Sequence, residues 1–159
     1  MLAVLAQVTT RVRVGGMAKG MHHRHPAVTA NMVATLDRDS GGRLELGIGA
    51  GWNFMLCDGY GIDLGPLRDR SDRLEEGMEA IVRLLPETAT TYTGRFFDMA
   101  DAWCEPKSAQ ERIPIVIGGQ GRVQTLRTAA KYADQWDMTF PADVAAWREL
   151  NEVLRARRA

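Results

Sequence analysis

Residues 43–52 read RLELGIGAGW, and here a strand pattern runs straight into a glycine-rich turn. Apolar side chains alternate with polar side chains or glycine, which is the period of a β-strand, and one face carries Leu44, Leu46 and Ile48. From Gly47 to Gly51 every second residue is glycine. Such glycines either serve turn geometry alone or let a ligand approach the backbone closely. Because ligands bind at the carboxyl ends of parallel strands, this stretch predicts a binding edge.

Strand and helix patterns alternate outward from this stretch in both directions. Further strands are predicted over residues 11–18, 113–118 and 135–140. Helices are predicted from Pro26 to about Asp37, from Leu67 until Pro86, over 122–133 and over 142–157. The aromatic segment 92–104 is predicted to be a hairpin or an irregular excursion. This alternation is typical of an α/β fold in which right-handed crossovers join parallel strands.

The predicted helices carry apolar stripes that should face the sheet. In the helix after Pro26 the stripe consists of Val28, Met32 and Leu36. The helix from Leu67 has the clearest pattern, with Leu74, Met78, Ile81 and Leu85 on the same face as Leu67. The last helix places one stripe at Val144, Trp147, Asn151 and Leu154.

Charge and composition exclude several classes of protein. The chain has 159 residues, with 20 Lys and Arg against 20 Asp and Glu. A net charge of zero argues against nucleic acid or an anionic membrane as the main partner, because both reward a basic surface. Its two cysteines, Cys57 and Cys104, are too few for a disulfide framework and fit a reducing compartment, so we expect a cytoplasmic location. The start is a poor signal peptide, and no apolar run is long enough to span a membrane.

The glycine motif has one alternative interpretation, an S-adenosylmethionine-dependent methyltransferase. In that interpretation residues 45–51, ELGIGAG, form the first motif, and Asp63 in YGIDLGP binds a ribose. That fold needs a whole helix between the two motifs. Residues 52–59 would span only about 12 Å as a helix, with nothing left for the connecting loops. The spacing therefore argues against a methyltransferase.

A combination of motifs covers most of the chain. It consists of HP opening a helix at 25–26, SGGRLELGIGAGW, YTGRFF, and IGGQG followed by a helix ending in YAD and a tryptophan. From about residue 3 to residue 150 the chain resembles the luciferase-like monooxygenase family, and most of all the branch that uses the deazaflavin coenzyme F420. The resemblance implies a (β/α)8 barrel. Such barrels run to about 250 residues, so residues 1–159 are expected to be one incomplete domain, roughly strands three to six.

The resemblance also implies a coenzyme site for F420, or alternatively FMN, at the carboxyl mouth of the barrel. The family's third strand ends in a bulge, often with a non-proline cis peptide, and the coenzyme residues implied here are Gly15, Gly16, Met17, Gly49, Ala50, Gly51, Trp52, Gly118, Gly119, Gln120 and Gly121. The last four match a loop near the coenzyme phosphate. Independently, three glycines before a helix expose N–H groups to an anion, although a plain strand-to-helix turn would also use them. A deazaflavin enzyme would transfer hydride to or from a small molecule, whereas an FMN enzyme could activate oxygen.

No catalytic acid or base is identified. His22 or His23 could point into the mouth as a proton donor, whereas His25 before Pro26 fits a helix entry. The residues offer no metal site, and Cys57 has no visible base partner. Relatives commonly carry acidic residues just after GWN, where this chain has Phe54, Met55 and Leu56. A non-catalytic remnant of a barrel is therefore the rival hypothesis.

Two structural expectations follow from the strand patterns. The strands over 11–18 and 43–49 should be adjacent and parallel, with their apolar faces toward the helices. Arg13 and Glu45 then share the inner face, where we expect them to pair. If water reaches that face, the loss of stability on removing one partner should be smaller than for a buried pair. Residues 11–18 and 135–140 should form the two open edges of the sheet, which predicts self-association.

Overall fold

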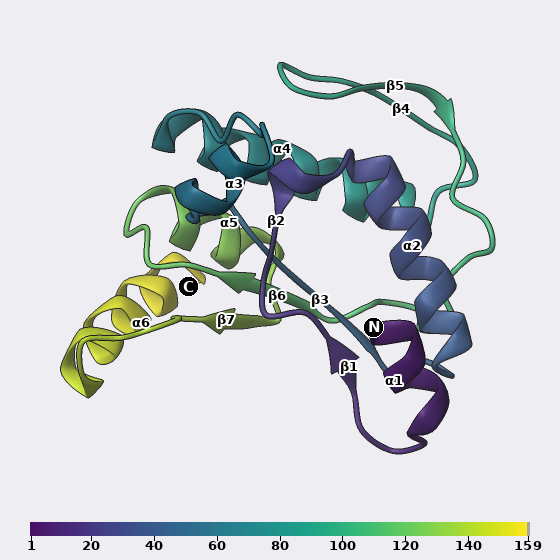
Figure 1. The fold of residues 1–159 in the computed structure, drawn as a ribbon, viewed down its shortest axis with the longest axis horizontal. Helices are drawn as coiled ribbons and strands as arrows, with labels where there is room; N and C mark the ends of the chain where they lie inside the picture. The colour runs from purple at the N-terminus through teal and green to yellow at the C-terminus, as the bar shows by residue number, and fades with distance from the viewer. Residues whose placement is uncertain (159) are drawn as a thin grey trace.

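The computed structural model describes residues 1–158, arranged around one parallel sheet (Figure 1). The strand order is β1-β3-β6-β7, formed by Val14–Gly15, Leu44–Gly49, Ile115–Gly118 and Gln135–Asp137. The short strand β2, Lys19–Gly20, pairs with the carboxyl end of β3. It lies on the same side of β3 as β1, because β6 occupies the other side. The sheet therefore has four strand positions, half of the eight that close a (β/α)8 barrel. A partial barrel is confirmed.

The strand predicted over 11–18 is interrupted, which corrects the prediction. Its two parts, β1 and β2, pair with opposite ends of β3. Between them the Met17–Ala18 peptide bond is cis, and the backbone of Gly16 crosses the face of Gly47. A bulge with a cis bond is what the family resemblance implied at this place. The strand predicted over 135–140 is also shorter, because Phe140 has a positive φ of 55° that no strand accommodates.

Four long helices agree with the predicted ones to within two residues at each end. They are α2 (Pro26–Asp39), α4 (Leu67–Leu84), α5 (Gln124–Tyr132) and α6 (Val144–Arg158). His25 caps α2, since its Nδ1 accepts a hydrogen bond from the N–H of Ala27 at 3.2 Å. None of the described helices combines the length and the apolarity that a membrane crossing requires.

Three short helical elements were not predicted, α1 (Leu2–Val8), the 3-10 helix η1 (Met21–His23) and α3 (Phe54–Gly59). The signal for α3 is present in the sequence: the side chain of Asn53 accepts a hydrogen bond from the N–H of Leu56, as an N-cap residue does. For α1, seven residues without a capping side chain offer no comparable signal.

The helices pack in sequence order, α2 on α4, α4 on α5 and α5 on α6, and enclose the core against the sheet. Ile48 of β3 and Ile117 of β6 are fully buried. The helices cover them with fully buried side chains at Leu74, Met78, Ile81, Leu84 and Leu126. The predicted apolar face of α4 is therefore confirmed except at Leu67, which is exposed.

Two other predicted stripes hold only in part, because each reaches the core with one residue only, Leu36 in α2 and Leu154 in α6. In α2 the buried face is made of Thr29, Ala30, Val33, Ala34 and Asp37, and the stripe residues Val28 and Met32 are 50% and 49% exposed. In α6 the stripe residue Leu154 is buried and Trp147 stacks on Trp136 of β7, with 6.4 Å between the ring centres, whereas Val144 is 64% exposed. The physical reason in α2 is that small residues let the helix approach β3 and α4 closely, which turns its larger apolar side chains outward.

The buried carboxylate of Asp37 joins three distant segments. Its Oδ2 accepts hydrogen bonds from the backbone N–H groups of Ala109 and Gln110 at 2.9 and 2.8 Å. Its Oδ1 accepts from Nε2 of Gln110 at 2.7 Å and from the N–H of Leu44 at 3.4 Å. The end of α2, the start of β3 and the loop before β6 are thereby held together.

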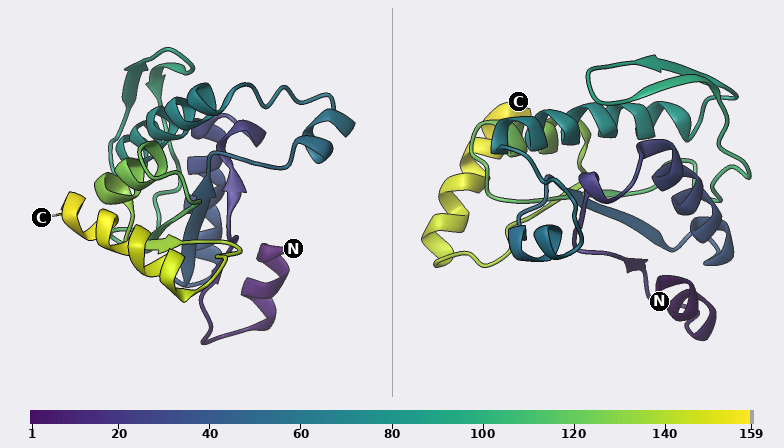
Figure 2. Two further views of the ribbon diagram at one scale, coloured as in Figure 1. Left: turned by 90° about the vertical axis from the view of Figure 1, so that its left-hand side faces the viewer. Right: turned by 45° about the horizontal axis from the view of Figure 1, so that its top comes forward.

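The aromatic segment forms the predicted hairpin, with strands β4 (Thr90–Thr93) and β5 (Asp98–Ala102) outside the main sheet (Figure 2). Its turn is anchored by Glu76 of α4. The carboxylate of Glu76 accepts from the N–H groups of Phe96 and Phe97, both at 2.8 Å, and from that of Arg95 at 3.1 Å. A Cβ on Gly94 would overlap this carboxylate, which explains the glycine in YTGRFF.

We expect Glu76→Ala to release the hairpin turn from α4. Three backbone N–H groups lose a charged acceptor, so the free energy of unfolding should fall by about 2–3 kcal/mol. Amide hydrogen exchange at Arg95, Phe96 and Phe97 measures the local effect. Glu79→Ala is the matched control, because Glu79 lies one turn further along α4 and reaches only Lys131, at 4.0 Å. Equal exchange in both variants would contradict the assignment.

Arg13 and Glu45 pair as predicted, with 2.5 Å between Nε and Oε1. The two strands are adjacent and parallel, and Leu44, Leu46 and Ile48 are buried on the opposite, helix-facing side. The pair is not buried, since the two side chains are 46% and 22% exposed. A pair this open to water contributes up to about 1 kcal/mol, and removing one partner should cost well below the about 3–5 kcal/mol expected for a buried pair.

Candidate coenzyme site

Glycines gather where three neighbouring strands end. Gly49 of β3 pairs with Gly20 of β2 on one side and with Gly118 of β6 on the other. A Cβ on Gly49 would lie 2.9 Å from the carbonyl oxygen of Gly118, and one on Gly118 would lie 3.0 Å from Cβ of Ala18. Side chains are therefore sterically excluded here, and the carboxyl edge of the sheet presents bare backbone.

Two exposed apolar side chains stand beside this bare edge. Met17, at the cis bond, is 68% exposed, and Trp52, three residues after the end of β3, is 72% exposed. Gly51, with a φ of 89°, provides the turn that leads to Trp52. Of the predicted site residues, Gly15 and Gly16 lie away from the edge, because Gly15 pairs with Glu45 and the carbonyl of Gly16 lies against Gly47, four and two residues before Gly49.

The loop Gly118–Gly121 leads from β6 toward α5 and is fixed at both ends. Gly119 donates its N–H to the carbonyl oxygen of Asp137, and its own carbonyl accepts from Nε1 of Trp136 at 2.8 Å. The side chain of Gln120 donates to the carbonyl oxygen of Thr139 at 2.6 Å. Within residues 1–158, the backbone N–H groups of Gln120 and Gly121 have no acceptor. They remain available to an anion near the N-terminus of α5.

A polar cluster supports the other side of the edge. The ring of His22 lies against Gly20 and Gly51, where any added Cβ would overlap it. Its Nε2 is 3.4 Å from Sγ of Cys57, so Cys57 does have an imidazole partner, contrary to the prediction. Arg70, a buried residue of α4, donates from Nη1 to the carbonyl oxygen of Gly51 at 2.9 Å. These contacts position the turn that carries Trp52.

Burial, together with the neighbouring His23, Arg73 and Arg70, lowers the pKa of His22 to about 4, although a hydrogen bond with the backbone of Ala50 acts in the opposite direction. The imidazole is therefore neutral at pH 7. A neutral ring has no imidazolium proton to deliver, which argues against His22 as the proton donor of this site. Phe54, Met55 and Leu56 form the exposed first turn of α3 and supply no acid either.

We expect His22 to make the protein acid-sensitive. The folded pKa of about 4 lies below the ordinary 6.5, so the unfolded chain takes up this proton first. The stabilising contribution is complete above pH 6.5 and is lost as the pH falls from 6.5 toward 4. Melting temperatures measured between pH 7 and 4.5 should therefore fall less steeply for His22→Asn than for wild type. His25→Asn, which keeps a capping side chain, should retain the wild-type slope, and equal slopes in all three proteins would contradict this origin.

The comparisons with known proteins agree with this geometry. Residues 1–159 match the sequence profile of the luciferase-like monooxygenases. The chain belongs to the luciferase-like monooxygenase family. An uncharacterized protein of Mycobacterium tuberculosis is 32% identical over 143 residues, which are 90% of this chain and 49% of that protein. The 5,10-methylenetetrahydromethanopterin reductase of Archaeoglobus fulgidus is 36% identical over 135 residues, 84% of this chain and 38% of the reductase.

A solved structure shows the same relation in three dimensions. The coenzyme F420-dependent tetrahydromethanopterin reductase of Methanopyrus kandleri superposes with a TM-score of 0.82 and 26% identity, covering 98% of this chain and 49% of the reductase. This family member thus spans half or less of the length of these relatives, and its sheet holds half of a barrel's strand positions.

Three residues that were not predicted from the sequence also belong to the site of this luciferase-like chain. Asp137 ends β7, and its Oδ2 would lie 3.7 Å from a Cβ on Gly118. The strand predicted over 135–140 placed Asp137 in its interior, so the prediction gave no signal that this carboxylate stands at the strand end. Arg70 and Cys57 had none, because their partners come from segments 19 and 35 residues away. Among residues 1–158, no three or more His, Cys, Asp or Glu side chains are grouped for a metal ion.

Proposed function

We propose that this chain supplies coenzyme-binding elements of an F420-dependent oxidoreductase that acts on a small molecule. The observation that carries the proposal is the bare backbone edge formed by Gly49 and Gly118, bordered by Met17 and Trp52. A flat ring can lie against such an edge, whereas side chains would hold it away. The chain superposes on the coenzyme F420-dependent reductase of Methanopyrus kandleri, and this similarity supports the choice of F420 over FMN.

Each part of the edge has its own task in this proposal. Gly49, Gly118 and Ala18 would border the ring, and the exposed indole of Trp52 would shield it from water. The free N–H groups of Gln120 and Gly121 would bind a phosphate group of the coenzyme. When bound, a deazaflavin supplies hydride transfer and reacts poorly with oxygen.

The mechanism places little chemistry on the protein side chains themselves. Arg70 and His22 hold the Gly51 turn in place. The imidazole of His22 is neutral at pH 7 and therefore adds no positive charge to the coenzyme site. The apolar start of α3 supplies no proton, so proton transfer to substrate would need a group other than residues 54–56. The free state of both cysteines fits the cytoplasmic location that we propose.

Titration of the purified chain with F420, and separately with FMN, tests the proposal by absorbance. We expect a saturable spectral change with F420. Trp52→Ala should weaken binding about tenfold, the value of an aromatic contact of about 1.4 kcal/mol. Trp103→Ala is the matched control, because Trp103 is 67% exposed but follows the hairpin, away from the sheet edge.

The outcomes separate the candidate functions. Binding of FMN alone would replace the proposal by the flavin alternative, in which oxygen activation becomes the chemistry. No spectral change with either coenzyme would overturn both and favour a non-catalytic remnant of the barrel. Equal weakening by Trp52→Ala and Trp103→Ala would contradict the assignment of Trp52.

A further inference from the structure

The sheet has two open edges that run in the same direction. β1 pairs only with β3, and β7 pairs only with β6, among the described residues. Val14 directs its N–H to the carbonyl oxygen of Arg43, so the N–H of the next residue, Gly15, faces the open side. Because all four strands are parallel, the edge of β7 is complementary in direction to the edge of β1 in another copy.

Two helices near these edges expose apolar side chains to solvent. α2 covers the β1 side of the sheet and exposes Val28 and Met32. α6 is the next helix after β7 and exposes Val144, whereas Trp147, which is 40% exposed, stacks with one face on Trp136. The two helices lie at opposite sides of the sheet (Figure 1), too far apart to cover each other within one copy. Val28, Met32 and Val144 are therefore left uncovered by the rest of residues 1–158.

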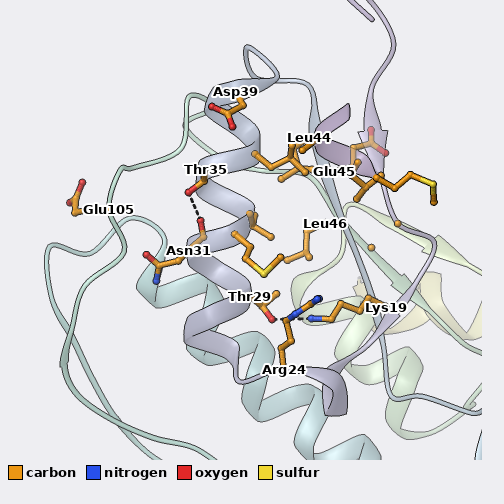
Figure 3. Close-up of a pocket in the computed structure, with 18 residues that line it drawn as sticks. Lys19, Arg24, Thr29, Asn31, Thr35, Asp39, Leu44, Glu45, Leu46 and Glu105 are labelled. Atoms are coloured by element: carbon orange, nitrogen blue, oxygen red, sulfur yellow. Dashed lines mark hydrogen bonds between the residues drawn. The ribbon is translucent and has the colours of Figure 1, made fainter. Parts of the chain in front are cut away.

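An open groove of about 720 Å³ lies beside the stripe of α2. It is lined by Met32 and Leu36 of α2, by Leu44 and Leu46 of β3, and by residues 1–3 at the start of the chain. Figure 3 labels Leu44 and Leu46 in this lining. Its lining is mainly apolar, with Lys19 and Arg24 together at one end. An amphipathic helix is the kind of element that such a groove accommodates.

The exposed surface of one copy is also too large for its mass. A folded monomer of 17.6 kDa is expected to expose about 7,900 Å², whereas this chain exposes 9124 Å². The excess is about 1,200 Å² for each copy, or about 2,400 Å² for a pair, which is the range of obligate dimer interfaces.

We propose that two copies of this chain close one eight-stranded barrel through a two-fold axis along its centre. In each of two identical seams, β7 of one copy pairs with β1 of the other. The Val144–Trp147 stripe of α6 then packs against the groove beside α2 of the partner copy. Closed symmetry uses both edges of each copy and leaves none to recruit further chains.

This arrangement would also complete the coenzyme mouth. The bare edge at Gly49 and Gly118 comes from the middle of the sheet, and the inner face beside it is open in one copy, as the exposure of Arg13 and Glu45 shows. Two copies would surround one mouth with eight strand ends. The dimer itself rests on the edges and stripes alone, so it stands or falls independently of the coenzyme.

Light scattering on the purified chain, over a hundredfold range of concentration, is the test. We expect a mass of twice 17.6 kDa with no larger species. Val144→Glu should give monomers while keeping the helix, because a carboxylate in the first turn of α6 suits the helix N-terminus. Ala145→Glu is the matched control in the same turn, facing about 130° from the centre of the stripe, and should remain dimeric.

A second variant tests the other side of the seam. Met32→Glu should also give monomers, since Met32 is half-exposed and glutamate favours a helix. Circular dichroism verifies that each variant is folded. Wild type that is monomeric throughout, or that grows into open polymers, overturns the proposal. Dissociation by Met32→Glu but not by Val144→Glu would indicate an interface of β1 with β1 and would overturn it as well.

Discussion

Replacing Gly47 by alanine is expected to prevent stable folding of this chain. A Cβ on Gly47 would overlap the carbonyl oxygen of Gly16, which belongs to the backbone and cannot rotate away as a side chain could. The segment from Gly16 to Ala18 would have to leave the face of β3. We expect a loss of about 3 kcal/mol or more in the free energy of unfolding, above the usual cost of an added methyl group.

Gly16→Ala is the control for this prediction. Nothing lies within 4 Å of a Cβ at Gly16, and its φ is not positive, so the same chemical change should leave stability nearly unchanged. Urea unfolding followed by circular dichroism measures both variants. Similar midpoints for the two variants would show that the crossing of Gly16 over Gly47 is not as tight as described.

Replacing Asp37 by alanine should cost nearly as much. The backbone N–H groups of Ala109 and Gln110 and the side-chain amide of Gln110 would lose their acceptor. Each donor left without a partner costs about 1–3 kcal/mol, but Nε2 of Gln110 keeps the carbonyl oxygen of Leu44 at 2.9 Å, so we expect a total of about 2–4 kcal/mol.

Asp39→Ala is the matched control, because Asp39 lies two residues further along α2 with its side chain exposed. Its effect should stay within about 0.5 kcal/mol. Thermal or urea unfolding is again the measurement. A small effect of Asp37→Ala would mean that water replaces the carboxylate, and the loop before β6 would then not depend on α2.

Much of the fold could be read from residue patterns. The alternation in residues 44–49 and the apolar run at 115–118 identified the two central strands, because burial on the helix side demands branched apolar residues at every second position. The helix from Leu67 was recognisable from its spacing and from the proline that follows it. The edge strands were harder, since β1 and β2 have only two residues each and no pattern marks where Gly16 leaves the ladder.

The candidate site was predictable only in part. The glycines at 49, 51, 118 and 119 stood out because backbone approach and positive φ leave glycine as the only suitable residue. The pairing of His22 with Cys57 and the support of Gly51 by Arg70 did not, because each joins residues whose separation in sequence carries no periodic signal.

By itself, therefore, the sequence of this luciferase-like chain determined the class of fold, the central strands, the long helices and the glycine edge, because each depends on local spacing. The tertiary structure alone decided which helix faces are buried. In α2 the small residues Ala30 and Ala34 turned inward, where close packing on α4 outweighs the burial of larger side chains, and Met32 was left outside. It also decided where the strand predicted over 11–18 is interrupted, because the crossing of Gly16 over Gly47 is a contact between segments that are distant in the sequence.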